Sequence, residues 1–100
     1  MNKMTYQQFK AELLQLHPIC EYCNFRKATE VHHCLIHRRK GVTELDCIEN
    51  CAAVCSKCHY EGKVNGHEFR RRHWQKRKAE CFLMDRWLDQ LPLRVKEGFE

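Results

Sequence analysis

The sequence lacks a long apolar run. A membrane-spanning helix needs roughly 18 consecutive apolar residues, and no such run occurs along the chain. Residues 1–8 also lack the apolar segment of a signal peptide, and no repeat or low-complexity linker divides the chain. We therefore expect a cytoplasmic protein with no membrane partner and with one domain in its 100 residues.

A domain of this size buries little apolar surface and often depends on a disulfide or a metal ion to hold its fold. The sequence contains eight cysteines. Because the expected compartment is reducing, metal binding is favoured over a disulfide framework. We therefore expect zinc to stabilise this fold.

The charge of the chain favours a polyanionic partner. The sequence has 18 lysines and arginines against 13 acidic residues, which gives a formal net charge of +5. Such a balance makes nucleic acid the expected partner.

Helix signals mark both ends of the chain. Thr5 and Gln8 have the spacing of a capping box, and apolar residues then recur at helical spacing until Pro18, which predicts a helix over residues 5–16. Near the other end, a helical apolar stripe precedes Pro92: Met84, Trp87, Leu88 and Leu91. The charged residues 70–78 leave open whether one helix or two cover this region.

The middle of the chain predicts a small hairpin. Residues 29–33 and 51–54 are strand-like and are separated by a polar loop. Ser56 is expected to cap a short helix that carries His59 and ends near Gly62. A further helix is expected to be capped by Asn65 with Glu68.

Two cysteine pairs enclose this hairpin. Cys20 and Cys23 form one pair, Cys55 and Cys58 the other, and 31 residues separate the pairs. This spacing is typical of four thiolates around a tetrahedral zinc ion, which would be structural because protein fills all four positions. Buried free thiols or a redox pair are the alternative. The unpaired cysteines are expected to be small buried hydrophobes: Cys34, Cys47, Cys51 and Cys81.

A histidine constellation lies between and beside the pairs. In chain order it consists of Glu30, His32, His33, Asn50 and His59, the last directly after Cys58. With the cysteine pairs, this order and spacing over residues 20–67 resemble the H-N-H endonuclease family. The resemblance implies a small α+β protein with the ββα-metal (His-Me finger) motif, in which a hairpin and a helix surround one catalytic divalent ion, here flanked by terminal helices.

The resemblance also implies a role for each residue. His33 would be the general base that activates water, His32 and His59 would hold the catalytic ion, and Asn50 would hold the hairpin so that the base is oriented. Glu30 resembles an acidic residue that precedes the histidine pair in colicin-type nucleases. The alternative is that Glu30 is a plain surface carboxylate. Histidine suits the role of base because its ordinary pKa of about 6.5 leaves it neutral near neutral pH.

The sequence departs from the colicin pattern at Lys63, where another histidine ligand is expected. An ion with two protein ligands favours Mg²⁺ or Mn²⁺ over tightly held zinc, unless His37 or His67 is an extra ligand. Successive strand residues face opposite sides, yet His32 and His33 must approach one site, so we expect the strand to end or bulge there.

Two basic segments are expected to contact DNA phosphates: Arg38, Arg39 and Lys40 in the loop, and Arg70, Arg71, Arg72 and Lys76 in the tail. A solvated helix face is the alternative for the tail. Trp74 and Trp87 are expected to pack in the core, and His17 and His73 to be hydrogen-bonded structural groups.

The sequence therefore predicts a metal-dependent endonuclease acting on double-stranded DNA, and the resemblance to the H-N-H family implies that it leaves a 5′-phosphate and a 3′-hydroxyl. Residues 1–17 would form an N-terminal helix, 18–65 the zinc-stapled core and 66–100 a basic helical extension. The short layout is similar to that of phage and mobile-element nucleases, including homing endonucleases, and restriction and packaging roles are equally open. We expect a monomer or homodimer inside a bacterial or phage-infected cell. A non-catalytic, zinc-ribbon-like nucleic-acid-binding module and an RNA-directed nuclease remain alternatives.

Overall fold

The computed structural model describes residues 4–99 as a small, compact α+β protein. Its elements are α1 (Tyr6–Leu16), β1 (Glu30–His33), η1 (Thr43–Leu45), β2 (Cys51–Val54), α2 (Ser56–Tyr60), η2 (Lys63–Asn65), α3 (His67–Ala79), α4 (Met84–Gln90) and α5 (Leu93–Lys96). The α+β class and the small hairpin are thus confirmed. No helix within this part of the chain has the length and apolar character needed to cross a membrane.

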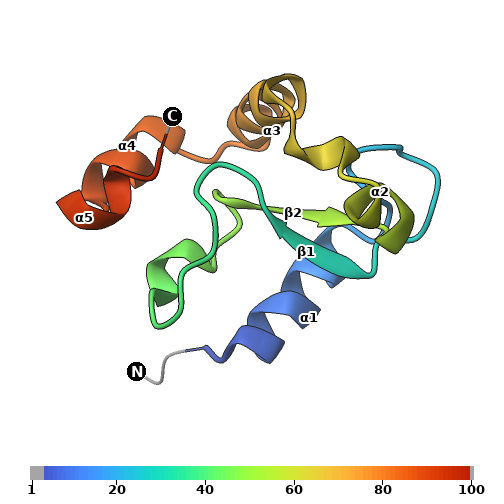
Figure 1. Ribbon diagram of the computed structural model, residues 1–100, viewed down its shortest axis with the longest axis horizontal. Helices are drawn as coiled ribbons and strands as arrows, with labels where there is room; N and C mark the ends of the chain where they lie inside the picture. The colour runs from blue at the N-terminus through green and yellow to red at the C-terminus, as the bar shows by residue number, and fades with distance from the viewer. Residues whose placement is uncertain (1–3, 100) are drawn as a thin grey trace.

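The hairpin lies between two helical layers. β1 and β2 pair antiparallel, with His33 opposite Cys51, and Figure 1 shows α1 and α3 on opposite sides of them. β2 is buried along its whole length because its residues alternate between the layers. Cys51 and Ala53 pack towards α1, whereas Ala52 and Val54 pack with residues of the cysteine knuckles and α3.

The first helix begins as the sequence predicts. The Thr5 N–H donates to Gln8 Oε1 at 2.8 Å, and the Gln8 N–H donates to Thr5 Oγ1 at 3.1 Å, which completes the capping box. α1 ends at Leu16, two residues before Pro18.

Two expected caps are wrong. α2 is capped by Cys55, whose Sγ accepts the Cys58 N–H at 3.4 Å, and Ser56 is already the first helical residue. Asn65 belongs to η2, so Gly66 precedes α3 and makes no side-chain cap. In both places a tight turn, the cysteine knuckle before α2 and η2 before α3, determines the residue at which the helix starts. The capping propensity of Ser56 and Asn65 does not reveal these turns.

The C-terminal region forms a second core with the loop between the strands. This cluster contains Leu35, Ile36, Leu45, Met84, Trp87, Leu91 and Val95, with Trp74 packed against it. Both tryptophans therefore pack as expected. The region contains three helices, and between α3 and α4 Cys81 has a left-handed φ of 74°. Cys81 is exposed, so its expected burial is wrong.

Candidate functional site

Four cysteines gather where the two knuckles meet. The Sγ atoms of Cys20, Cys23, Cys55 and Cys58 lie within 4.8 Å of one another. Zinc–sulfur bonds of about 2.3 Å in tetrahedral geometry place the sulfurs about 3.8 Å apart, so the cluster has the size that one ion needs. The four cysteines lie close enough to hold a metal, as structural zinc requires.

Backbone donors favour the thiolate form of Cys23 and Cys55, whereas burial and the neighbouring sulfurs raise the pKa of Cys58 to about 12. Burial raises the pKa of Cys23, but N–H groups of Phe25 and Arg26 outweigh it and lower the pKa to about 6. The first knuckle turns at Asn24, whose φ is 64° and whose N–H donates to the Cys20 carbonyl at 2.9 Å. Thiolates are the sulfur ligands that zinc binds, so the local backbone suits a metal.

His59 follows Cys58 in α2 and lies beside His32 of β1. The two ring centroids are 5.5 Å apart, with an angle of 66° between the planes. Glu30 is on the same face of β1, and its Oε1 accepts a hydrogen bond from His59 Nδ1 at 2.6 Å. This bond leaves Nε2 as the nitrogen of His59 that can bind an ion.

The His32 ring is neutral at physiological pH. Burial, together with the nearby His59, lowers its pKa to about 4, although a hydrogen bond to the Val64 backbone acts in the opposite direction. Neutral imidazole is the form that binds a metal ion. The groove in front of His59 and Glu30 is lined also by Ser56, Lys57 and Tyr60.

His33 lies in a different environment. Its Nε2 donates to Asp46 Oδ1 at 2.8 Å, and its ring lies nearly parallel to that of Tyr6, at a centroid distance of 6.4 Å. The Arg38 guanidinium lies over the Tyr6 ring, 4.2 Å from its centroid. Burial lowers the pKa of His33, against the opposing effect of Asp46, so the ring is neutral and able to accept a proton near pH 7.

The two adjacent histidines face opposite sides of the hairpin. β1 does not bulge, since each of its residues has one partner in β2, and it ends at His33. His32 contacts Phe69 of α3, whereas His33 contacts Tyr6 of α1. The structure thus brings His32 together with His59 and places His33 in a separate cluster at the end of the same strand.

Asn50 joins the two ends of the loop that follows β1. Its Oδ1 accepts from the N–H groups of Leu35 (3.2 Å) and Ile36 (2.8 Å), and its Nδ2 donates to the carbonyls of Ile36 and Leu45, both at 3.0 Å. The side chain is fully buried and uses all of its hydrogen-bonding capacity. Asn50 therefore fixes the position of Leu45 and of its neighbour Asp46.

Sequence reasoning missed Asp46. The residue lies 13 positions after His33, in a loop whose path depends on Asn50 and on packing against α4 and α5. No spacing rule covers a contact of this kind.

The two possible extra ligands, His37 and His67, are both exposed, as is Lys63, which takes the place of a histidine of the colicin pattern. Lys63 is exposed and pairs with Glu61 at 3.0 Å. His67 begins α3, and His37 is exposed. His37 lies near enough to His32 and His33 to influence the pKa of both.

A buried ion pair joins the first knuckle to α3. The Arg77 guanidinium donates from Nη1 and Nη2 to the two carboxylate oxygens of Glu21, at 2.7 and 2.8 Å. The Ala53 N–H also donates to this carboxylate at 2.7 Å. Burial raises the pKa of Glu21, but Arg77 outweighs it and the pKa falls to about 2. Sequence analysis predicted none of these contacts.

A second group could geometrically hold an ion, namely His17, Glu21 and Glu80. Arg77 Nη1 donates to Glu80 Oε1 at 3.0 Å as well as to Glu21, so a guanidinium already supplies positive charge there. His73 of α3 is buried, and its Nε2 donates to the Glu49 carbonyl at 2.8 Å. It is a hydrogen-bonded structural group, as expected.

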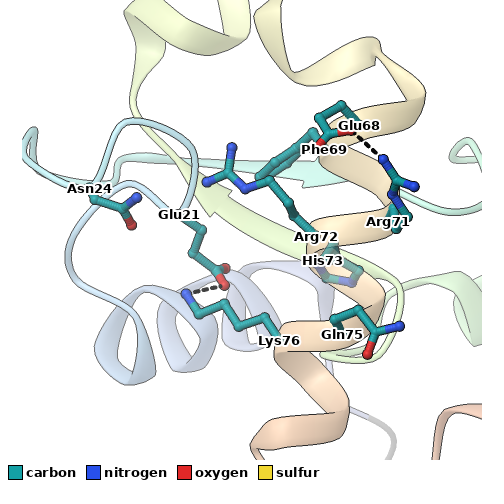
Figure 2. A pocket seen from close by; sticks show the side chains of 9 residues that line it. All are labelled: Glu21, Asn24, Glu68, Phe69, Arg71, Arg72, His73, Gln75 and Lys76. Atoms are coloured by element: carbon teal, nitrogen blue, oxygen red, sulfur yellow. Dashed lines mark hydrogen bonds and ion pairs between the residues drawn. The ribbon is translucent and has the colours of Figure 1, made fainter.

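The basic residues lie on two surfaces. Arg38, Arg39 and Lys40 line a groove of about 500 Å³ whose wall also contains Tyr6 and Asp46. The second surface is the side of α3 that faces the first knuckle, where three of the expected residues, Arg71, Arg72 and Lys76, line a pocket (Figure 2).

Several of these cations already have partners. Arg71 pairs with Glu68 at 2.6 Å and Lys76 with Glu21 at 2.9 Å, as Figure 2 shows. Arg72 lies over the rings of Tyr22 and Phe69, and Arg70 lies 5.9 Å from the Phe99 ring centroid. In the loop, Arg39 donates to the Arg94 carbonyl at 2.8 Å.

Three unpaired cysteines are protonated thiols, of which Cys34 and Cys51 are buried and Cys47 is partly buried. Burial raises the pKa of Cys34 and of Cys47 to about 12, and it raises that of Cys51 well above its ordinary value. They behave as small hydrophobes, as expected.

No family model, curated protein or solved structure matches this chain.

Proposed function

We propose that this protein is a metal-dependent endonuclease of the H-N-H type, which hydrolyses phosphodiester bonds of double-stranded DNA. The observation that carries the proposal is the contact between His32 and His59, with Glu30 hydrogen-bonded to the second of them. Two imidazoles bound to one ion have centroids about 5 Å apart, close to the observed 5.5 Å. A carboxylate on the outer nitrogen is a common support for a metal-binding histidine.

The surrounding elements support a ββα-metal arrangement. β1 carries His32, and α2, which follows β2 directly, carries His59. The four-cysteine cluster would bind structural zinc and so fix Cys58 at the start of α2. Because His59 is the next residue, the same zinc would restrict the position of the ring that holds the catalytic ion.

The chemistry requires a base and a positive charge. A bound Mg²⁺ or Mn²⁺ would supply charge that offsets the charge building on phosphorus and on the leaving oxygen. His33 would take a proton from water as the water oxygen forms a bond to phosphorus. The bond from phosphorus to O3′ then breaks, and O3′ takes a proton from solvent, which leaves a 5′-phosphate and a 3′-hydroxyl.

The substrate would cross the free side of β1. Within residues 4–99, β1 pairs only with β2, so its other edge has no strand partner. A phosphate at the end of β1 could meet His32 and His59 from one face of the strand and His33 from the other. The groove lined by Arg38 and Lys40 also contains Tyr6 and Asp46, the two residues that contact His33, and its cations would contact neighbouring phosphates.

Plasmid cleavage tests the proposal. Zinc-loaded protein is incubated with supercoiled plasmid and Mg²⁺ or Mn²⁺, beside His33→Ala and an EDTA control. We expect nicking or linearisation by the wild type alone. A wild type that retards DNA on a gel but cleaves none with any divalent ion would contradict the proposal and favour a non-catalytic binding module.

A further inference from the structure

His33 uses one ring nitrogen inside the protein and leaves the other one available. Nε2 donates to Asp46 Oδ1 at 2.8 Å, and the ring is 7% exposed. Among the described residues, none forms a hydrogen bond with His33 Nδ1. Trp87 Nε1 is the one fully buried side-chain nitrogen or oxygen among them that lacks a partner, so Nδ1 is not fully buried. Nδ1 of His33 is therefore accessible to water.

Asp46 is held firmly in front of the ring. It follows η1 directly, and the last residue of that turn, Leu45, gives its carbonyl to Asn50 Nδ2 at 3.0 Å and to Cys51 Sγ at 3.4 Å. Leu45 itself is fully buried in the cluster formed with α4 and α5. The backbone next to Asp46 thus has little freedom to move.

We propose that Asp46 is the positioning residue for His33, because its carboxylate keeps the proton on Nε2 and directs the lone pair of Nδ1 to the attacking water. The inference rests on the proposed function. A carboxylate is an acceptor only, so it selects the tautomer that is protonated at Nε2. During the step Nδ1 gains the proton of water, Nε2 keeps its own, and Asp46 faces the resulting imidazolium.

The position of Asp46 excludes a role as ligand of the proposed catalytic ion. It contacts His33 on the side of the hairpin that faces Tyr6, whereas His32 and His59 lie on the side of Phe69. Its effect on catalysis would pass through His33 alone.

The test compares Asp46→Ala and Asp46→Asn with Glu44→Ala, which removes an exposed carboxylate from the same turn. The ring N–H signal of His33 is recorded by NMR on the zinc-loaded protein at about pH 8, above the ordinary histidine pKa of about 6.5. Cleavage is measured as kcat and KM on one duplex.

In Asp46→Ala we expect the Nε2–H signal to be lost to exchange with water and kcat to fall by about 100-fold at unchanged KM. In Asp46→Asn, which keeps an acceptor oxygen, the signal should remain and kcat should fall less. Glu44→Ala should match the wild type. Zinc content and thermal unfolding verify the fold, and if Asp46→Ala does not fold, Asp46→Asn and its smaller loss of kcat carry the test.

Either a retained N–H signal or a wild-type kcat in folded Asp46→Ala would overturn the inference while leaving the proposed function intact. A loss in KM alone would overturn it too, since that result indicates a substrate contact. A wild type that cleaves no DNA would instead refute the proposed function, and the NMR comparison would still measure whether Asp46 holds the ring.

Discussion

Replacing Arg77 by methionine should destabilise the protein strongly, although the residue touches no proposed catalytic group. The guanidinium is fully buried and donates five hydrogen bonds to oxygen atoms of Glu21, Ile48, Cys51 and Glu80. It joins α3 to the first cysteine knuckle and to the start of β2. Methionine fills much of the volume but leaves the Glu21 carboxylate, which is 4% exposed, without its main partner.

The cost can be worked out from these contacts. Removing one partner of a buried ion pair costs about 3–5 kcal/mol, because the other charge stays buried. Lys76 and the Ala53 N–H still contact Glu21, and we therefore expect about 4 kcal/mol for Arg77→Met. Adding Glu21→Gln removes the stranded charge, so the double variant should regain about 1–2 kcal/mol relative to Arg77→Met.

Urea unfolding of the zinc-loaded protein measures these differences. Arg71→Met is the control, since that side chain is 73% exposed and its ion pair with Glu68 should be worth less than about 1 kcal/mol. A loss below about 1 kcal/mol for Arg77→Met, or a double variant less stable than Arg77→Met, would refute the reasoning.

Three further predictions concern the metal, a buried histidine and the loop. Removing zinc with a strong chelator should unfold the chain, since structural zinc contributes on the order of 10 kcal/mol in small domains; an unchanged circular dichroism spectrum would contradict this. The pKa of His73 is lowered from 6.5 to about 4 in the fold. The unfolded state therefore binds more protons between these values, so the folded state loses stability as the pH falls from about 7 towards 4. When the pH is lowered from about 7 to about 5.5, the free energy of unfolding of the wild type should fall by about 1 kcal/mol more than that of His73→Gln. Urea titrations of both proteins at the two pH values measure this, and an equal loss in both would contradict the prediction. Asn50→Ala should lower the free energy of unfolding by about 3 kcal/mol, because buried backbone groups of the loop lose their hydrogen-bond partners. Calorimetry measures this, and an unchanged stability would show that the loop keeps its conformation without Asn50.

The regular elements of the fold followed from local signals. The capping box of Thr5 and Gln8 predicted α1, and the strand-like residues 29–33 and the apolar residues 51–54 predicted the two strands. The caps of α2 and α3 did not follow, because the cysteine knuckle at Cys55 and the turn of η2 displace the cap from Ser56 and Asn65. Tertiary constraints fix those positions, and local propensity is too weak to reveal them.

The candidate site was predictable where ligands are close in sequence. The spacing of the cysteines indicated a metal cluster, and the four sulfurs do meet. Asp46 and Arg77 were not predictable, since each contacts its partner, His33 or Glu21, across a path that packing determines. The run of basic residues in α3 likewise concealed that Arg77 faces inward and is fully buried.

The central claim is that His33 activates water for metal-dependent hydrolysis of DNA. A single-turnover time course on an end-labelled duplex tests it most directly, with zinc-loaded wild type, His33→Ala and Glu44→Ala compared in Mg²⁺. We expect cleavage to 5′-phosphate ends by the wild type and by Glu44→Ala, and a rate at least about 100-fold lower for folded His33→Ala. Equal rates for wild type and His33→Ala, or binding without cleavage by the wild type, would contradict it.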